Sequence, residues 1–181
     1  YTEEDLQQYF DDTYRPLHWR ELLHNPKRHV LVAYTQNSID RSGAFLRGQI
    51  VGYACVGGPT DLPVDIEDEA RERCGDLLRC YVDPSVFGRG VAKRLVDMGL
   101  KWLLPRFTGD VYIGVWSENW RAQSFYKKYG AKVVKEYLYP VGDKHDKEYV
   151  MRCDRVDIEA YMKNLEAFEN KNQFQKHTIQ T

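Results

Sequence analysis

The sequence predicts a single α/β domain. Two segments carry this prediction, because each alternates apolar and polar residues as a strand does and then changes to the spacing of a helix. They span residues 79–95 and 111–130. A chain of 181 residues with 43% apolar and 13% aromatic content is large enough to bury one hydrophobic core. We therefore expect one domain over residues 1–154, followed by a C-terminal amphipathic helix and tail over residues 155–181.

Two short helices and two strands are expected at the start of the chain. Residues 2–12 begin with Thr-Glu-Glu-Asp, a pattern typical of a helix start, and residues 17–25 predict a second helix. Residues 29–34 and 49–56 are rich in β-branched and aromatic residues and predict strands. The polar stretch 35–48 between them predicts a loop.

A glycine-rich turn joins a predicted strand over residues 76–82 to a predicted helix over residues 91–105. Apolar residues recur in this helix at spacings of four, three and four, and a proline ends it. Gly88 and Gly90 lie just before its start. Glycine lets the backbone approach a ligand closely, and the first N–H groups of a helix have no partner within it. This turn therefore predicts an anion site.

The charges around the turn support that prediction. Arg89, Lys93 and Arg94 add full positive charges to the helix dipole, so a pyrophosphate suits the site. A dinucleotide fingerprint would need glycine where Lys93 stands, and a phosphate-binding P-loop would need a longer spacing between its glycines. Taken alone, the two glycines are equally consistent with an ordinary strand-to-helix turn.

The second segment predicts a strand over residues 111–116 and a short helix that ends at Gly130. Apolar residues of the helix fall on one face. Asn119 precedes this helix, where it could act as an N-cap, and Tyr126 could be a core aromatic.

The C-terminal third predicts a hairpin of residues 133–139 with residues 148–153 and then a helix. After Asp154 the apolar side chains recur at helical spacing. They are Ile158, Tyr161, Met162, Leu165 and Phe168. This apolar face packs either on its own domain or on a second subunit. From Lys171 on, a loose polar tail is expected.

Together, the two segments resemble the two acetyl-CoA-binding motifs of the GNAT superfamily, the Gcn5-related N-acetyltransferases. The first matches in the strand, the Phe-Gly-Arg-Gly-Val-Ala turn and the helix, and the second matches in Asn-x-x-Ala-x-x-Phe-Tyr-x-x-x-Gly. The resemblance implies a central mixed, mostly antiparallel twisted sheet flanked by helices, with a splayed parallel strand pair that holds CoA. It also implies acetyl-CoA as co-substrate. The family's first strand and helix are expected to be missing ahead of Tyr1.

The resemblance also implies which residues contact the cofactor. They are Tyr81, Val82, Phe87, Gly88, Arg89, Gly90, Val91, Ala92, Lys93, Asn119, Ala122, Phe125 and Tyr126. Phe87 departs from the glutamine or arginine usual in the family. Asn119 is expected at the pantetheine arm and Tyr126 beside the CoA sulfur. A phenol with a pKa near 10 can give a proton or a hydrogen bond to the departing thiolate.

Transfer to an amine also requires a base, because an alkylamine with a pKa of about 10.4 is cationic at pH 7. Asp76 is the candidate, at the entry to the strand where many relatives carry glutamate. The backbone N–H groups of Tyr81 and Val82 are expected to stabilise the oxyanion. Cys80 is an alternative as a covalent nucleophile, but direct transfer is the family's usual route.

The acceptor is expected to be a small amine. Residues 58–76 carry seven carboxylates against two arginines, a rim that would attract a polycation unless it is simply a solvated helix face. Residues 136–152 look like the closing hairpin of bacterial GNATs similar to spermidine/spermine acetyltransferases. A small amine or polyamine is therefore favoured. The alternatives are a protein lysine or N-terminal acetyltransferase and, from another class, a non-catalytic CoA-binding regulatory module.

Composition excludes several other classes. A net charge of −1 argues against general nucleic-acid binding, and no apolar run reaches the roughly 18 residues of a membrane span. The four cysteines and five histidines show no metal-ligand spacing, so no metal is expected. We expect a cytoplasmic monomer or homodimer with reduced cysteines.

Overall fold

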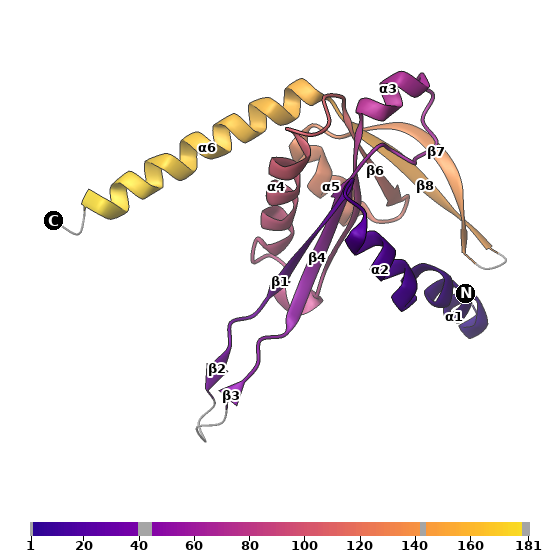
Figure 1. The fold of residues 1–181 in the computed structure, drawn as a ribbon, viewed down its shortest axis with the longest axis horizontal. Coiled ribbons are helices and arrows are strands. Elements are labelled where there is room, and N and C mark those ends of the chain that lie inside the picture. Colours follow the sequence, from indigo (N-terminus) through magenta and orange to yellow (C-terminus); the bar gives the residue numbers. More distant parts are fainter. Residues whose placement is uncertain (1, 40–44, 142–143, 179–181) are drawn as a thin grey trace.

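The computed structural model describes residues 2–39, 45–141 and 144–178 and shows a mixed α/β fold. Its six-stranded sheet has the order β1-β4-β5-β6-β8-β7, and only the β5–β6 pair is parallel. A separate pair, β2–β3, continues the β1–β4 hairpin away from the domain (Figure 1).

The observed helices and strands agree closely with those expected from the sequence and differ from them mainly at their ends. The helices are α1 (Glu3–Tyr14), α2 (Pro16–His24), α3 (Asp68–Arg73), α4 (Val91–Leu103), α5 (Trp120–Tyr126) and α6 (Arg155–Thr178), with the short 3₁₀ helices η1 (Pro84–Val86) and η2 (Lys127–Tyr129). The strands are β1 (Arg28–Tyr34), β2 (Ser38–Ile39), β3 (Phe45–Leu46), β4 (Ile50–Gly57), β5 (Gly75–Val82), β6 (Val111–Trp116), β7 (Lys132–Val141) and β8 (Lys144–Cys153).

The loop expected over residues 35–48 is the first correction. Ser38 pairs with Leu46 and Ile39 with Phe45, so the two strands continue as a ribbon. The residues between them, 40–44, lie outside the described part of the chain. Two-residue strands carry too little alternation to be recognised in a polar stretch, and antiparallel pairing of the neighbouring strands brings them together.

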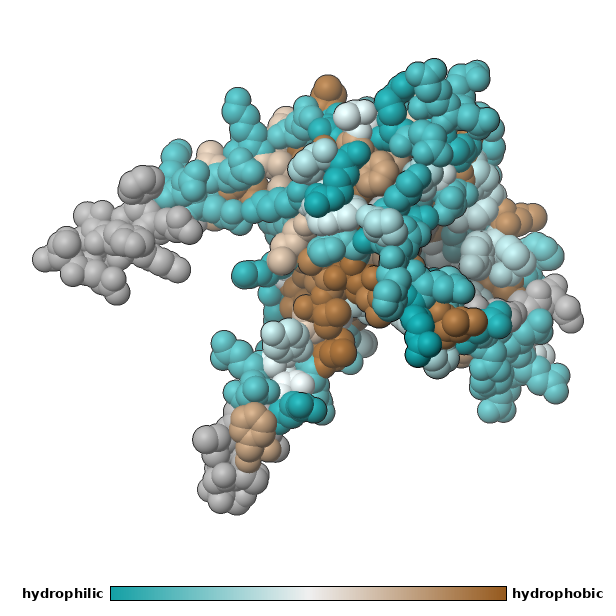
Figure 2. Space-filling model, viewed as in Figure 1, coloured by the Kyte–Doolittle hydropathy of each residue, from teal (hydrophilic) through white to brown (hydrophobic). Residues whose placement is uncertain are grey.

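Two apolar clusters lie on opposite faces of the sheet because side chains alternate along β6. Val111 and Ile113 belong to the main core under α4, α5 and α6, whereas Tyr112 belongs to a smaller cluster on the other face. On that other face, α1 contacts β7 and α2 contacts β1. The hydropathy surface in Figure 2 shows a further apolar patch where β1 and β4 leave the domain, at exposed residues such as Val32 and Ile50.

The parallel pair diverges almost as soon as it forms. Gly75 and Asp76 of β5 pair with β6, and no later residue of β5 does so. On its other side β5 stays paired with β4, but with a register shift that leaves Leu78 as the extra residue of a β-bulge. The splayed strand pair is therefore present, and the bulge changes the direction of the β5 side chains next to it.

The C-terminal helix packs on its own domain through its first half. Ile158 and Met162 are buried in the main core, whereas Phe168 is 64% exposed. The Arg155 guanidinium anchors its start by donating hydrogen bonds to the carbonyl groups of Leu104 and Phe107. The helix continues to Thr178, where a loose tail was expected from residue 171. Lysine and glutamine, which make up half of residues 171–178, are good helix formers, so the helix can continue through this stretch.

Among the described residues, no helix is long and apolar enough to cross a membrane.

Candidate active site

The glycine turn has the backbone conformation that the sequence predicts. Gly88 and Gly90 have φ angles of 76° and 79°, in the left-handed region where a side chain is strained. A Cβ atom added to either glycine would meet nothing within 4 Å. The turn therefore opens to free space on the side where α4 begins, and its glycines leave that space clear.

A cleft of about 770 Å³ lies at this turn, between the diverging ends of β5 and β6. Its lining includes every residue expected at the cofactor except Arg89. The additional lining residues are Cys80, Val86, Arg121, Ser124, Lys128, Tyr129 and Tyr161. The size, the glycine turn and the unpaired helix N-terminus suit a nucleotide cofactor with a pyrophosphate.

Arg121 supplies a cation beside Phe87. Its guanidinium carbon lies 3.9 Å from the centre of the Phe87 ring, which is a close cation–π contact. Both residues line the cleft. The family usually has glutamine or arginine at the position of Phe87. Here the Phe87 ring instead makes a cation–π contact with Arg121 of α5.

A buried carboxylate holds a second cation of the cleft, Lys93. Asp97 accepts hydrogen bonds from Lys93 at 2.6 Å, from Tyr129 at 3.0 Å and from Tyr161 at 3.1 Å. Tyr161 comes from α6, so the C-terminal helix contributes to the lining of the cleft. The hydrogen bond from Lys93 to Asp97 raises the pKa of Lys93, which keeps this side chain cationic.

Asn119 caps a helix and Tyr126 is a buried aromatic, and both also line the cleft, so their cofactor contacts stay a prediction. The Asn119 side-chain oxygen accepts from the Ala122 N–H at 3.0 Å and caps α5, and the residue also lines the cleft. Tyr126 is only 7% exposed, and burial raises its pKa, so the phenol stays protonated. Within the described part of the chain no hydrogen bond engages its hydroxyl group, which leaves that proton available for donation.

The β5 backbone offers one of the two expected oxyanion donors. Asp83 donates its N–H to Val51 of β4 at 2.8 Å. Because N–H directions alternate along a strand, the Tyr81 N–H also points toward β4 and the Val82 N–H points toward the gap beside β6. Val82 is therefore the backbone donor that faces the cleft, and Tyr81 contributes its side chain. Burial raises the pKa of Cys80 to about 11, which keeps that thiol neutral and unsuited to nucleophilic attack.

A second, smaller pocket of about 250 Å³ lies on the opposite side of β5. Its lining is rich in tyrosine and carboxylate side chains, and Tyr81 belongs to both cavities. The lining residues are Tyr9, Thr13, Asp61, Leu62, Asp76, Leu77, Leu78, Arg79, Tyr81, Gly114, Tyr137, Tyr139 and Glu148. The larger cleft and this pocket therefore meet at β5.

Asp76 is the buried carboxylate of this pocket. It is 3% exposed, and burial raises its pKa to about 6. Its Oδ2 atom accepts the Asp61 N–H at 3.2 Å, whereas its Oδ1 atom is buried without a hydrogen-bond partner in the described structure. A carboxylate with these properties can take a proton near neutral pH.

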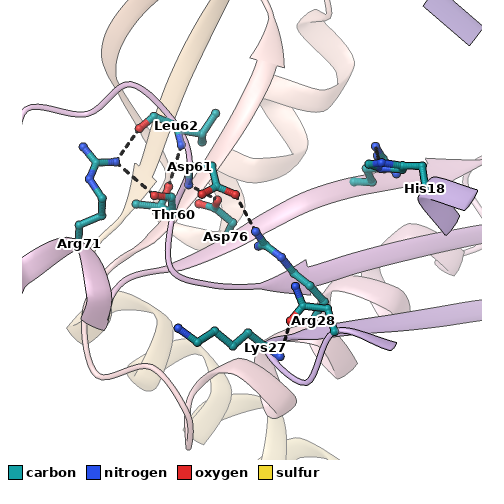
Figure 3. A network of polar contacts seen from close by, with 10 residues as sticks. His18, Lys27, Arg28, Thr60, Asp61, Leu62, Arg71 and Asp76 are labelled. Atoms are coloured by element: carbon teal, nitrogen blue, oxygen red, sulfur yellow. Dashed lines mark hydrogen bonds and ion pairs between the residues drawn. The ribbon is translucent and has the colours of Figure 1, made fainter. Parts of the chain in front are cut away.

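The loop that carries Asp61 is held from both sides, as Figure 3 shows. Arg71 of α3 donates hydrogen bonds to the carbonyl groups of Thr60, Leu62 and Val64 at 2.7–3.2 Å. On the other side, Arg28 of β1 forms an ion pair with Asp61 at 2.7 Å. The wall of the pocket therefore depends on two arginines that lie outside it.

Most of the acidic segment does not reach the pocket. Of its seven carboxylates, only Asp61 and Asp76 line it. Asp65 forms an ion pair with Lys135, and no residue of α3 is buried. This placement favours a solvated helix face over a rim that attracts polycations.

Sequence reasoning missed the second pocket's other polar groups. Glu148 accepts a hydrogen bond from Tyr137 at 2.5 Å, and burial raises the pKa of Glu148. Tyr9 comes from α1, far away in the sequence, and Arg79 lies directly after the bulge. The one available signal was Arg79, a lone cation in an otherwise apolar strand. In the described part of the chain, no group of three or more potential ligands could hold a metal ion.

Comparisons with known proteins agree with this geometry. A model of the acetyltransferase (GNAT) family matches residues 1–131. An uncharacterised N-acetyltransferase of Mycobacterium bovis is 28% identical over 148 residues, which cover 82% of this chain and 81% of that protein. NAA60 of Arabidopsis thaliana in complex with acetyl-CoA superposes with a TM-score of 0.60 at 15% identity, over 83% of this chain and 93% of that one. Mutant forms of the spermidine/spermine N-acetyltransferase SpeG of Vibrio cholerae give a TM-score of 0.54 at 14% identity, over 80% and 74% of the two chains. At such identities the two solved structures show the fold.

Proposed function

Since the chain belongs to the acetyltransferase (GNAT) family and is therefore an acetyltransferase, we propose that it transfers the acetyl group of acetyl-CoA directly to a small primary amine. A polyamine is among the candidate acceptors. The proposal depends on one observation above all. Tyr81 lies in the wall of both the cofactor cleft and the carboxylate pocket, so a thioester in one cavity is adjacent to an amine in the other.

The residues divide the chemistry in the following way. Asp76 accepts a proton from the ammonium group, and the free amine attacks the thioester carbon. The Val82 N–H stabilises the oxyanion that forms, because it faces the gap between the strands. The C–S bond then breaks and Tyr126 donates its proton to the thiolate. The attacking nitrogen loses its second proton, which restores the Tyr126 phenol, and Asp76 releases the first proton to solvent. The products are the N-acetylated amine, CoA and one proton released to solvent.

The pocket's size supports a small acceptor over a protein chain. A volume of about 250 Å³ accommodates a short amine rather than an extended segment of polypeptide. NAA60 and SpeG share the fold, and their likeness to this chain leaves the acceptor class open. The four cysteines are free thiols, which supports the cytoplasm as the place where the enzyme acts.

Release of free CoA with a panel of amines tests the proposal, with the acetylated product identified by mass spectrometry. Acetyl-CoA binding without turnover of any amine would instead favour a non-catalytic CoA-binding module. The variant Gly90→Val places a side chain in the free space at the turn, so we expect it to lose acetyl-CoA affinity by more than about tenfold in calorimetric titration. Gly130→Ala is the matched control, since Gly130 also has a positive φ, 84°, and does not line the cleft. Wild-type affinity in folded Gly90→Val would refute the phosphate site.

A further inference from the structure

The acceptor pocket contains a cation, Arg79, that forms no ion pair with a described carboxylate. Arg79 lines this pocket, together with Asp76. Within the part of the chain whose side chains the structure describes, no carboxylate forms an ion pair with Arg79, and its Nη1 atom is buried without a hydrogen-bond partner. A buried donor without a partner is costly, so native proteins keep few of them.

The surroundings of Arg79 hold it in place without neutralising it. Its Nη2 atom donates to the His18 ring at 3.3 Å, and its guanidinium carbon lies 5.4 Å and 5.6 Å from the ring centres of Tyr14 and Trp19. The side chains that make these contacts belong to α1 and α2, and none of them is a carboxylate. They fix the position of the cation while leaving its charge available to a ligand.

Asp76 presents the opposite charge in the same cavity. Its Oδ1 atom is also buried without a hydrogen-bond partner among the described residues, and the residue as a whole is only 3% exposed. The β-bulge at Leu78 lies between these two residues and turns both side chains into one pocket of β5. The pocket is therefore lined by one carboxylate and one guanidinium group, and each of them has an atom that no described residue pairs with.

We propose that the acceptor is an amine that carries a carboxylate a few atoms from its nitrogen, as an amino acid or dipeptide does, with Arg79 binding the carboxylate and Asp76 receiving the amine. Such a molecule pairs with both side chains at once. The pocket's other carboxylates, Asp61 and Glu148, already pair with Arg28 and Tyr137. A polyamine would therefore leave Arg79 without an anionic partner and would place a second positive charge near it. The inference rests on the proposed acetyltransferase function and narrows its substrate class.

Matched pairs of acceptors test this directly in steady-state kinetics. L-Lysine and 1,5-diaminopentane, or L-leucine and isopentylamine, differ only in the carboxylate. A charge-assisted contact to Arg79 predicts that kcat/KM is about 10- to 100-fold higher for the carboxylate member of each pair. L-Leucinamide keeps the bulk without the charge and is expected to fall with isopentylamine. This comparison uses the wild-type enzyme and needs no variant to fold.

A substitution then assigns the preference to its residue. In Arg79→Met, which keeps much of the length of the side chain and removes its charge, the ratio of kcat/KM within each pair is expected to fall toward 1, mainly through a higher KM for the carboxylate member. Arg73→Met is the matched control, because Arg73 is exposed on α3 and outside the pocket, and the ratio should stay at its wild-type value.

The outcomes separate this inference from the proposed function. Turnover of spermidine or 1,5-diaminopentane in preference to every carboxylate-bearing amine would overturn the inference and leave the acetyltransferase proposal standing. An unchanged preference in folded Arg79→Met would also overturn it. The absence of turnover with any amine, despite acetyl-CoA binding, would refute the proposed function itself.

Discussion

Replacing Asp76 with asparagine should make the protein less active. The free energy of unfolding of the variant, relative to that of the wild type, should also be higher above pH 6 than in acid. The physical reason is the cost of a buried charge. Burial raises the pKa of Asp76 from 3.8 to about 6, a shift of about two units. At about 1.36 kcal/mol per unit, the ionised carboxylate reduces the free energy of unfolding by about 3 kcal/mol at neutral pH.

The sign of the pH dependence follows from the direction of the shift. The folded protein binds this proton more tightly than the unfolded chain does, so the wild type gains stability from the group in acid. It loses that gain as the pH rises from about 4 to about 6. The amide side chain of the Asp76→Asn variant cannot ionise. The difference in unfolding free energy between variant and wild type should therefore shift in favour of the variant by about 3 kcal/mol across that window and then stay level.

Urea denaturation between pH 4.5 and 8 measures the part of this shift above pH 4.5, about 2 kcal/mol, and the comparison across pH cancels any constant cost of the new amide group. That constant cost is about 1–3 kcal/mol, since the amide buries a donor where Oδ1 lacked a partner. The exposed Asp68 on α3 provides the control, and Asp68→Asn should leave the free energy of unfolding unchanged at each pH.

Activity gives the second measurement for Asp76→Asn. If Asp76 is the base, kcat falls by roughly 10²- to 10⁴-fold, and the acidic limb of kcat/KM near pH 6 disappears. Wild-type kcat together with a stability difference that does not change with pH would refute the reasoning, because Asp76 would then have the same pKa in the folded and unfolded protein and would not be catalytic.

Three further substitutions test other parts of the site. Tyr126→Phe keeps the packing of the ring and removes the acid, so kcat should fall by roughly 10²- to 10⁴-fold with acetyl-CoA affinity nearly unchanged; a rate within a factor of two of wild type would make Tyr126 a packing residue. Arg71→Ala removes three hydrogen bonds from the pocket wall and should raise KM for the amine several-fold in steady-state kinetics. Arg73→Ala on the same helix should not, and equal effects of the two variants would show that the hydrogen bonds of Arg71 do not hold the pocket wall in place. Arg121→Met should weaken acetyl-CoA binding about three- to tenfold at low salt and less at high salt, as calorimetry can measure; an effect independent of salt would show that Arg121 acts by packing.

Local sequence patterns and the family resemblance predicted which residues gather at the larger cleft, and their role in cofactor binding stays a prediction. A glycine turn before an amphipathic helix and a capped helix with an aromatic face are both encoded within about 20 consecutive residues each. The structure accordingly places twelve of the thirteen expected cofactor residues in one cleft, all but Arg89. The expected role of the Tyr81 N–H as an oxyanion donor came from the family resemblance alone. The strand register directs this N–H toward β4 and away from the cleft.

The acceptor side was only partly predictable. Asp76 was found as a strand-entry carboxylate, but its burial and unpartnered oxygen depend on Thr60 and Asp61 folding over it. The acidic composition of residues 58–76 suggested a binding rim, and most of those carboxylates instead face solvent. The composition of a segment gives the number of charged side chains and says nothing about the direction in which each one points, which explains this difference.

By itself the sequence determined most of the strands and helices and the glycine turn, because spacing, glycine positions and alternation act between near neighbours along the chain. Only the tertiary structure decided the carboxylate pocket. Its wall brings together Tyr9 of α1, Arg79 after a β-bulge, and Glu148 of β8, which are separated by about 70 residues each. A bulge shifts side chains from one face of a sheet to the other, and packing between distant elements sets which polar atoms stay unpaired. Neither effect leaves a periodic signal in the sequence.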